Sequence, residues 1–157
     1  MLFRNDIFCT NERSFVLLYK IKTIPAMSRF HKLNIKDIQK ETKDCVSVAF
    51  EVPASLKEDF FYSPGQHLVL KTNINGEDIR RSYSICSSPS ENELRVAIKQ
   101  IEGGVFSTFA NSQLKAKDQL EVMAPSGKFG FHKRDKTTGA FIAFAAGSGI
   151  TPIISII

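Results

Sequence analysis

The chain has 157 residues, of which 43% are hydrophobic and 24% are charged, and its formal net charge is +5. This length is enough for one domain with a hydrophobic core and too short for two complete domains, and the composition excludes disordered and collagen-like proteins. The modest positive charge favours an anionic ligand or an acidic protein partner over nucleic acid, because basic and aromatic residues are not interleaved on a recognisable binding motif.

The cysteines and the apolar segments exclude further classes. Cys9, Cys45 and Cys86 are an odd number at wide spacing, which fits neither a disulfide framework nor a zinc site, and the close cysteine run of a plant-type iron–sulfur cluster is absent from the sequence. No apolar stretch approaches the roughly 20 residues of a membrane span or forms the core of a signal peptide. We therefore expect reduced thiols, no metal, no membrane contact and a cytoplasmic location.

Short strands follow a featureless N-terminal segment. Residues 1–27 show no sustained hydrophobic period and are interpreted as an unstructured or loosely attached leader. The first predicted strand is Val46–Val52, where apolar side chains alternate with small or polar ones. Later strands show the same alternation, with turn residues such as Asn73–Gly76 between them. They are predicted at His67–Lys71, Arg80–Ile85, Leu94–Ile98 and Gln119–Met123.

One helix is predicted at Val105–Leu114, because Phe106 and Phe109 fall on one helical face. Repeated short strands separated by turns are typical of an antiparallel barrel or sandwich. The fold class expected for residues 28–135 is therefore mainly β with one short helix.

The character of the sequence changes after residue 135. Ala140–Ala146 is an unbroken apolar run, typical of a strand buried on both faces of a parallel sheet, and it leads into a glycine-rich turn. Thr151 is a candidate cap for a following helix, with Pro152 at its first position. We interpret residues 136–157 as the first strand and turn of a truncated α/β nucleotide-binding domain.

Three segments could bind a nucleotide cofactor. On the strand Arg81–Ser84, Arg81 and Tyr83 are expected to point to one face, where an arginine can pair with a phosphate and a tyrosine can pack on a flat ring system. Gly103–Thr108 places backbone amides and hydroxyls at a helix start, which favours an anion. The glycines of Gly147–Pro152 allow close approach of a phosphate to the backbone. Each segment alone is equally compatible with an ordinary structural role.

The order and spacing of these segments resemble the ferredoxin–NADP reductase superfamily, and especially its oxygenase reductases. The loop Ser63–His67 also looks like the one that precedes the flavin motif in that family. The resemblance extends over Ser28–Ile157. It implies a six-stranded antiparallel Greek-key barrel that binds flavin in residues 28–135, followed by the start of an NAD(P)-binding domain.

The resemblance also implies roles for individual residues. Arg81 would contact the flavin pyrophosphate, Tyr83 would pack on the isoalloxazine ring, and Ser84 would hydrogen-bond near the reactive nitrogen. The segment Val96–Lys99 would line the ring and the ribityl chain through backbone groups. The pyrophosphate would be held by Gly104, Val105 and Ser107, and Thr151 would lie between flavin and nicotinamide. In chain order the implied cofactor-binding set is Arg81, Ser82, Tyr83, Ser84, Val96, Ile98, Lys99, Gly104, Val105, Phe106, Ser107, Gly147, Gly149 and Thr151.

The expected function follows from that cofactor. The family implies a flavin-dependent oxidoreductase that passes electrons from NAD(P)H through FAD, more commonly than FMN, to an iron–sulfur protein or domain, with an oxygenase component as a candidate partner. No catalytic acid or base is needed for hydride transfer. Two other interpretations stay open, namely a non-catalytic flavin- or ligand-binding module and an all-β domain that binds an acidic protein or RNA.

Overall fold

The computed structural model describes residues 29–130 and 142–157. The predicted leader and the predicted domain boundary near residue 135 lie outside these residues. Among the helices of the described parts, none has the length and hydropathy needed to cross a membrane. The strands and α-helices are β1 (Phe30–Thr42), β2 (Cys45–Glu51), β3 (His67–Ile74), β4 (Glu77–Ser84), β5 (Leu94–Lys99), α1 (Val105–Ser112), β6 (Gln119–Met123) and α2 (Ile150–Ile156).

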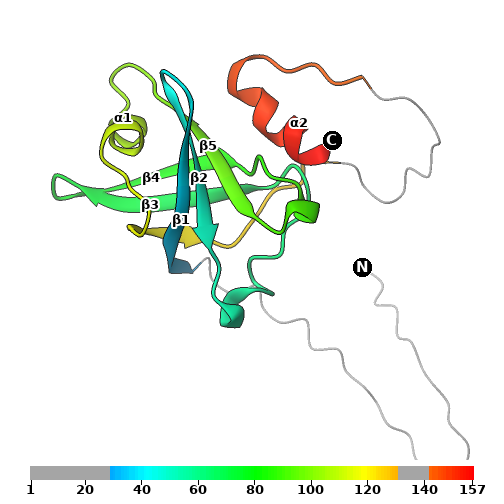
Figure 1. Cartoon of the computed structure of the whole chain (residues 1–157), viewed down its shortest axis with the longest axis horizontal. Coiled ribbons are helices and arrows are strands. Elements are labelled where there is room, and N and C mark those ends of the chain that lie inside the picture. The colour runs from blue at the N-terminus through cyan, green and yellow to red at the C-terminus, as the bar shows by residue number, and fades with distance from the viewer. Residues whose placement is uncertain (1–28, 131–141) are drawn as a thin grey trace, which may run out of the picture.

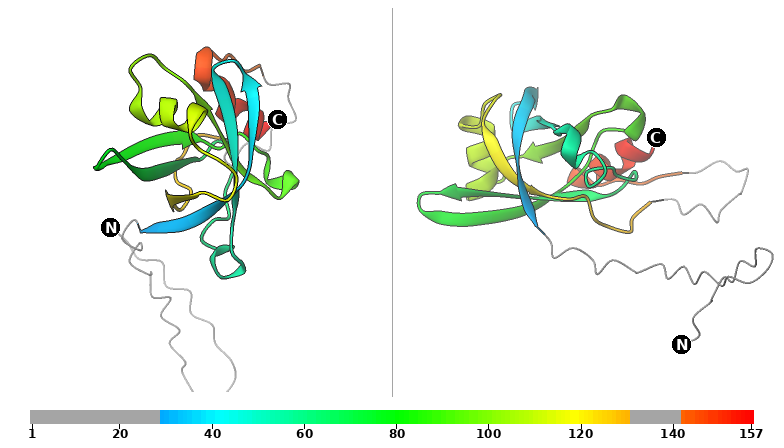
Figure 2. Two further views of the ribbon diagram at one scale, coloured as in Figure 1. Left: turned by 60° about the vertical axis from the view of Figure 1, so that its left-hand side comes forward. Right: turned by 90° about the horizontal axis from the view of Figure 1, so that it is seen from below.

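The six strands form one antiparallel sheet in the order β4-β3-β6-β1-β2-β5. The sheet curves so far that its two edge strands meet, because an isolated bridge pairs Ile85, directly after β4, with Val96 of β5. Two further views show the strands curving around a common interior, with α1 over one side (Figure 2). The predicted six-stranded antiparallel barrel with one short helix is confirmed, whereas its description as a Greek key stays a prediction.

Strand β1 was not predicted. Leu33 and Ile35 alternate with polar residues and are buried, but irregularities in the pairing with β2 between Ile35 and Asp37 and between Lys40 and Thr42 break the alternation. A bulge of this kind shifts which side chains face the core. Because of this irregular pattern, the sequence did not indicate that this segment is a strand. In the structure it is a central strand of the sheet and pairs with both β2 and β6.

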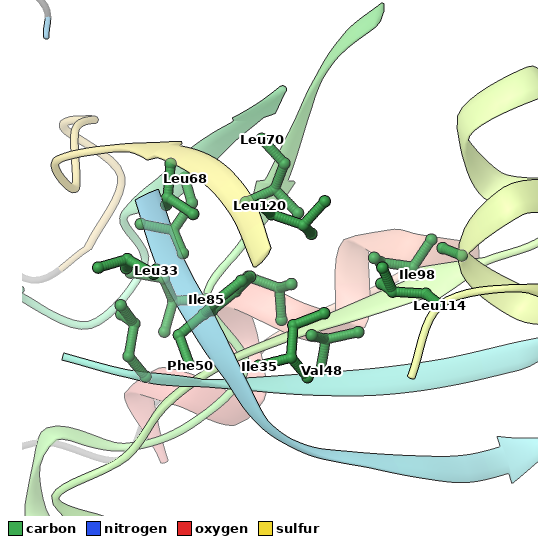
Figure 3. Packing of buried hydrophobic residues seen from close by; sticks show 14 of the residues in the cluster. Leu33, Ile35, Val48, Phe50, Leu68, Leu70, Ile85, Ile98, Leu114 and Leu120 are labelled. Carbon is green, nitrogen blue, oxygen red and sulfur yellow. The ribbon is translucent and has the colours of Figure 1, made fainter. Parts of the chain in front are cut away.

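Apolar side chains from every strand fill the barrel. The labelled side chains in Figure 3 come from β1, β2, β3, β5, β6 and the loops, and point into one shared interior. Burial of this surface is the main stabilising contribution to such a fold. The fully buried members include Leu33, Ile35, Val48, Leu68, Leu70, Ile85, Val96, Ile98, Phe106, Leu120 and Val122.

A tight hairpin joins β3 to β4 and projects beside α1. Asn75 and Gly76 both have positive φ values, 55° and 89°, as a two-residue hairpin turn of the primed type requires. Asn73 supports the turn, because its Oδ1 accepts a hydrogen bond from the Gly76 amide at 3.0 Å. The turn chemistry predicted from the sequence is thereby confirmed. Helix α1 contacts β3, β4 and β5, and lies over the hairpin in Figure 1.

The C-terminal segment differs from its prediction. No strand is assigned to residues 142–146, and Ile142 and Phe144 are 82% and 91% exposed. The first two residues of the predicted strand lie outside the described residues. A strand of a parallel sheet needs hydrogen-bonded neighbours, and no described segment pairs with this one. The expectation of a buried strand is therefore wrong for residues 142–146.

The helix after the glycine turn also starts earlier than predicted. Helix α2 begins at Ile150 with Gly149 as its N-cap, so Thr151 is the second helical residue and Pro152 the third. The Thr151 hydroxyl donates to the backbone oxygen of Ser148 at 2.8 Å. The predicted cap at Thr151 is therefore wrong, because the short 3₁₀ turn Gly147–Gly149 already leads into the helix.

Candidate functional site

Strand β4 places its predicted residues on two faces. Tyr83 is opposite Leu68 and Arg81 is opposite Leu70 in the pairing with β3, and both leucines are fully buried. Directly opposed residues of an antiparallel pair share a face. Arg81 and Tyr83 therefore lie on the face that α1 covers, while Ser82 and Ser84 lie on the other, as the sequence predicts.

Tyr83 lies half-buried against α1. Its ring centroid is 5.7 Å from that of Phe106, with the two planes inclined by 36°. Burial raises the pKa of Tyr83 to about 12, against a smaller lowering by the positive charge of Arg81. The phenol is thus neutral at physiological pH, and its partly exposed ring offers an aromatic surface for a planar ligand.

Arg81 is an exposed cation next to this ring. Its Nη1 donates to the backbone oxygen of Arg80 at 2.7 Å. No carboxylate among the described residues forms an ion pair with Arg81, in contrast to Arg95, which pairs with Asp37 and Glu93 at 2.7 Å each. The Arg81 guanidinium is therefore available to pair with an anion such as a phosphate.

The start of α1 supplies backbone donors. The helix has no side-chain cap, and the amide of Thr108 donates to the backbone oxygen of Gly104 at 2.9 Å. The amides of Val105, Phe106 and Ser107 precede that first bond, so they have no acceptor within the helix. Together with the positive end of the helix dipole, these amides favour a negatively charged ligand.

The side chains at this helix start have structural roles. The Ser107 hydroxyl accepts from the Ile101 amide at 3.2 Å and donates to the Gly104 oxygen at 3.1 Å, which closes the loop before α1. A Cβ at Gly104 would lie 2.5 Å from Ile101 Cγ1 and would also clash with Ser107 Oγ. Phe106 is 1% exposed. Ser107 and Phe106 can therefore meet a ligand only through their backbone, whereas Gly103 borders open space.

On β5, the structure separates the predicted residues into two buried side chains and one exposed side chain. Val96 and Ile98 are fully buried in the core. Lys99 is exposed, and its Nζ lies 3.6 Å from a carboxylate oxygen of Asp44. Val96 and Ile98 can therefore meet a ligand only through backbone groups, which is the kind of contact that the resemblance implies for this segment. Asn111 fixes α1 against β5, because its Nδ2 donates to the Ile98 oxygen at 3.0 Å.

The third predicted motif lies apart from the first two. Among the described residues, no hydrogen bond joins Gly147, Gly149 or Thr151 to β4 or α1. The C-terminal segment docks instead through Ser155, whose buried hydroxyl donates to the Ser87 oxygen at 2.7 Å. Figures 1 and 2 place α1 and α2 at different ends of the barrel. The structure thus brings together β4, β5 and α1, and leaves the glycine turn at the end where β4 finishes.

Ser87 belongs to a hydrogen-bonded cluster that the sequence did not reveal. The buried Tyr62 hydroxyl lies 2.9 Å from Ser87 Oγ and donates to the Glu93 oxygen at 3.0 Å. The Arg95 amide donates to Ser87 Oγ at 3.1 Å, and its guanidinium lowers the pKa of Glu93. These bonds hold the loop between β4 and β5, and so fix the distance between the two strands.

A hollow of about 310 Å³ lies between the tip of the β3–β4 hairpin and α1. It could not be foreseen from the sequence, because its two walls are more than 25 residues apart along the chain and meet only through the fold. Its side-chain lining is Ile74, Asn75, Val105, Thr108, Phe109 and Gln113.

Comparison with known proteins identifies the family. Residues 32–131 match the oxidoreductase FAD-binding domain. The chain belongs to this family. It is 46% identical over 131 residues to a subunit of 1,2-phenylacetyl-CoA epoxidase from Escherichia coli (strain K12), a match that covers 83% of this chain and 37% of that protein. It is 35% identical to the ferredoxin reductase component of 3-ketosteroid-9-alpha-monooxygenase from Rhodococcus rhodochrous, over 85% of this chain and 38% of the relative.

Solved structures agree with this assignment. Phthalate dioxygenase reductase superposes with a TM-score of 0.64 at 29% identity, over 80% of this chain and 38% of that one. Ferredoxin-NADP+ reductase from Plasmodium falciparum has a TM-score of 0.62 at 26% identity, over 80% of this chain and 51% of that one. The chain thus spans less than two-fifths of the two curated relatives, at 37% and 38% of their lengths.

The site fits the cofactor of this family. Among the described residues it combines a half-exposed aromatic ring, a guanidinium without a carboxylate partner and a helix start with free amides, which match a flat ring system and a phosphate chain. Within residues 29–130 and 142–157, no three His, Cys, Asp or Glu side chains gather as metal ligands.

Proposed function

We propose that this chain is the flavin-binding part of an NAD(P)H-dependent reductase that delivers electrons to an iron–sulfur protein or domain of an oxygenase system. The proposal rests on one observation. Tyr83 and Arg81 lie on the same face of β4, and α1 packs against that face. An aromatic surface, an available cation and unpaired amides occur there in the order in which a flavin presents its ring and its phosphates.

Each residue would contribute binding or orientation. Tyr83 would pack against the ring, Ser84 would donate a hydrogen bond near its reactive nitrogen, and Arg81 would neutralise a phosphate. The amides of Val105 to Ser107 would hold the phosphate chain, with Gly104 and Ser107 shaping the loop. FAD would supply the ability to accept a hydride and release single electrons. The protein would hold this group in a fixed position between its donor and its acceptor.

The nicotinamide donor would approach at the opposite end of the site from the hairpin tip. The segment that contains Gly147, Gly149 and Thr151 docks on Ser87 through Ser155. Ser87 follows Ser84, the last residue of β4, by only three residues. The names of the relatives support a redox partner, since they are a component of an epoxidase and a reductase component of a monooxygenase. A second domain starting near residue 136 belongs to the same proposal.

Substitution of two neighbouring arginines, one at a time, tests the proposed flavin site. Arg81 faces α1, whereas Arg80 lies on the opposite face, with its guanidinium carbon 5.2 Å from the ring centroid of Phe30. Arg81→Ala should weaken flavin binding by about 1–3 kcal/mol, the worth of one charge-assisted hydrogen bond, and Arg80→Ala should leave it unchanged. The readout is the flavin dissociation constant from isothermal titration calorimetry. Equal effects of the two substitutions would overturn the site.

A further inference from the structure

The tip of the β3–β4 hairpin carries the only Asn–Gly pair in the sequence, Asn75–Gly76. Both residues are exposed, and a Cβ built at Gly76 would meet no atom within 4 Å. Asparagine followed by glycine is chemically labile, because glycine has no side chain to obstruct its own backbone nitrogen. The tip therefore combines a reactive pair of residues with free access of water.

The reaction available to this pair is deamidation. The Gly76 backbone nitrogen loses its proton to solvent and bonds to Cγ of the Asn75 side chain. The Cγ–Nδ2 bond breaks, and the amide nitrogen leaves as ammonia with a proton taken from water. Water then opens the cyclic imide at one of its two carbonyl groups. The product at position 75 is an aspartyl or an isoaspartyl residue, and the reaction needs no oxidant or reductant.

The Asn73 side chain restrains this reaction. Its Oδ1 accepts a hydrogen bond from the Gly76 amide at 3.0 Å, so the nitrogen must give up that bond before it can lose its proton. Its Nδ2 donates to Oδ1 of Asp78 at 3.1 Å across the hairpin, which fixes the Asn73 amide in this orientation. Exposed tips open locally at a lower free-energy cost than barrel strands do. The rate at Asn75 should therefore depend on how often the Asn73 bond opens.

The product would change the charge of the hollow beside the tip. Asn75 lines one wall of this hollow, and Gly103, Gly104 and Val105 at the start of α1 line the other. Within the described parts of the chain, no charged side chain lines the hollow. A carboxylate on the hairpin wall would lie across from the free amides and the positive dipole end of α1, and would repel an anion bound there.

We propose that Asn75–Gly76 is a deamidation site, that the Asn73 side chain sets its rate, and that the new carboxylate weakens anion binding at the start of α1. The first two parts depend on the hairpin alone. The third part rests on the proposed function, because it requires the flavin phosphates to lie at the start of α1.

Asn92 is a matched control within the same chain. It is exposed and has a φ of 52°, close to the 55° of Asn75, but it is followed by Glu93. The Glu93 side chain obstructs its own backbone nitrogen, so Asn92 should deamidate far more slowly than Asn75. Asn92 lies in the loop between β4 and β5 and does not line the hollow.

The first experiment measures the two rates in the full chain. The chain is incubated in mildly alkaline buffer and mapped by mass spectrometry, and labelling by an isoaspartyl methyltransferase identifies the isoaspartyl product. Deamidation should be at least tenfold faster at Asn75 than at Asn92. Asn73→Ala should speed the reaction at Asn75 about fivefold, the factor that corresponds to loss of one ordinary hydrogen bond. Asn73→Ser keeps an acceptor oxygen and should have a smaller effect.

The rates decide the first two parts of the proposal. Equal rates at Asn75 and Asn92, or the same rate at Asn75 with and without the Asn73 side chain, would overturn it. The unmodified chain in urea gives the rate without the hydrogen bond, and serves in place of Asn73→Ala should circular dichroism show that variant unfolded. The ratio of the Asn75 rate to the Asn92 rate should then be larger in urea than in the folded chain, and an unchanged ratio would contradict the restraint by Asn73.

The second experiment introduces the charge directly. Asn75→Asp keeps a pair that forms the same type of turn, and Asn92→Asp adds the same charge away from the hollow. FAD is titrated into each chain by isothermal titration calorimetry at low and at high salt. Asn75→Asp should weaken FAD binding about two- to threefold at low salt and lose this effect at high salt, because salt screens the repulsion. Asn92→Asp should leave FAD binding unchanged.

The outcomes of the second experiment separate this proposal from the flavin site. Equal FAD affinities of the Asn75→Asp and Asn92→Asp variants at low salt would overturn the effect of the carboxylate and leave the flavin site intact. Failure of the unmodified chain to bind FAD would contradict the proposed function and, with it, the third part of this proposal. The rates at Asn75 and Asn92 would still decide the first two parts.

Discussion

Replacement of Gly104 by alanine should disrupt the loop that leads into α1. Gly104 has an ordinary φ of −77°, so the need for glycine there is steric. The added Cβ would lie 2.5 Å from Ile101 Cγ1 and would clash with Ser107 Oγ, whose hydroxyl makes two hydrogen bonds. The Ile101 side chain is 62% exposed and can turn aside, so the cost of about 1–3 kcal/mol comes from displacing Ser107 and from the 3.1 Å contact with the Ile101 backbone oxygen. Loss of one Ser107 hydrogen bond adds about 1 kcal/mol.

The total expected loss in free energy of unfolding for Gly104→Ala is about 2–4 kcal/mol. With an m-value of about 2 kcal/mol/M, the urea midpoint should fall by about 1–2 M. Gly149→Ala is the matched control, because Gly149 has a helical φ of −62° and no atom within 4 Å of the added Cβ. The control should change stability by less than about 0.5 kcal/mol. Equal urea midpoints for the two variants would refute the steric explanation of Gly104.

Three further predictions concern the loop between β4 and β5 and the segment that docks on it. Tyr62→Phe should lower the free energy of unfolding by about 0.5–1.5 kcal/mol in urea titrations, because it removes one buried hydrogen-bond donor while the Ser87 and Glu93 oxygens keep the hydroxyls of Ser155 and Ser87 as donors; an unchanged midpoint would contradict a structural role for the hydroxyl. Burial raises the pKa of Cys86 to about 11, so its alkylation by iodoacetamide should be slow at pH 8 and rise about tenfold per pH unit toward that value; mass spectrometry that found rapid labelling at pH 7 would disprove this. Ser155→Ala removes the 2.7 Å bond to the Ser87 oxygen and should speed hydrogen exchange in residues 150–156 with little change in the strands; protection equal to that of the unmodified chain would show that this bond does not hold α2.

Local sequence patterns predicted much of the barrel. The predicted strand Gln119–Met123 agrees with β6, and the helix predicted to start at Val105 does so and ends two residues early, at Ser112. Both elements have an uninterrupted apolar period set by their own side chains. Strand β1 escaped prediction because bulges interrupt its alternation and its hydrogen bonds come from two distant strands.

The part of the site that depends on local periodicity was also predicted from the sequence. The facing of Arg81 and Tyr83 follows from the period of a strand, so it could be inferred from the sequence. The alternation of Leu94–Ile98 likewise predicts that Val96 and Ile98 face the core. The use of the Ser107 hydroxyl within its own loop was not predicted, because it depends on the exact path of the backbone before α1. The apolar run ending at Ala146 resembled a buried strand, but burial requires neighbours that no local pattern supplies.

The most direct test of the flavin site is the absorption spectrum of the purified chain during titration with FAD. We expect saturable binding, with perturbed flavin bands in the visible blue region, and release of unmodified FAD on heating. A folded chain that leaves the FAD spectrum unchanged at all concentrations would contradict the assignment of Arg81, Tyr83 and the start of α1 as a flavin site.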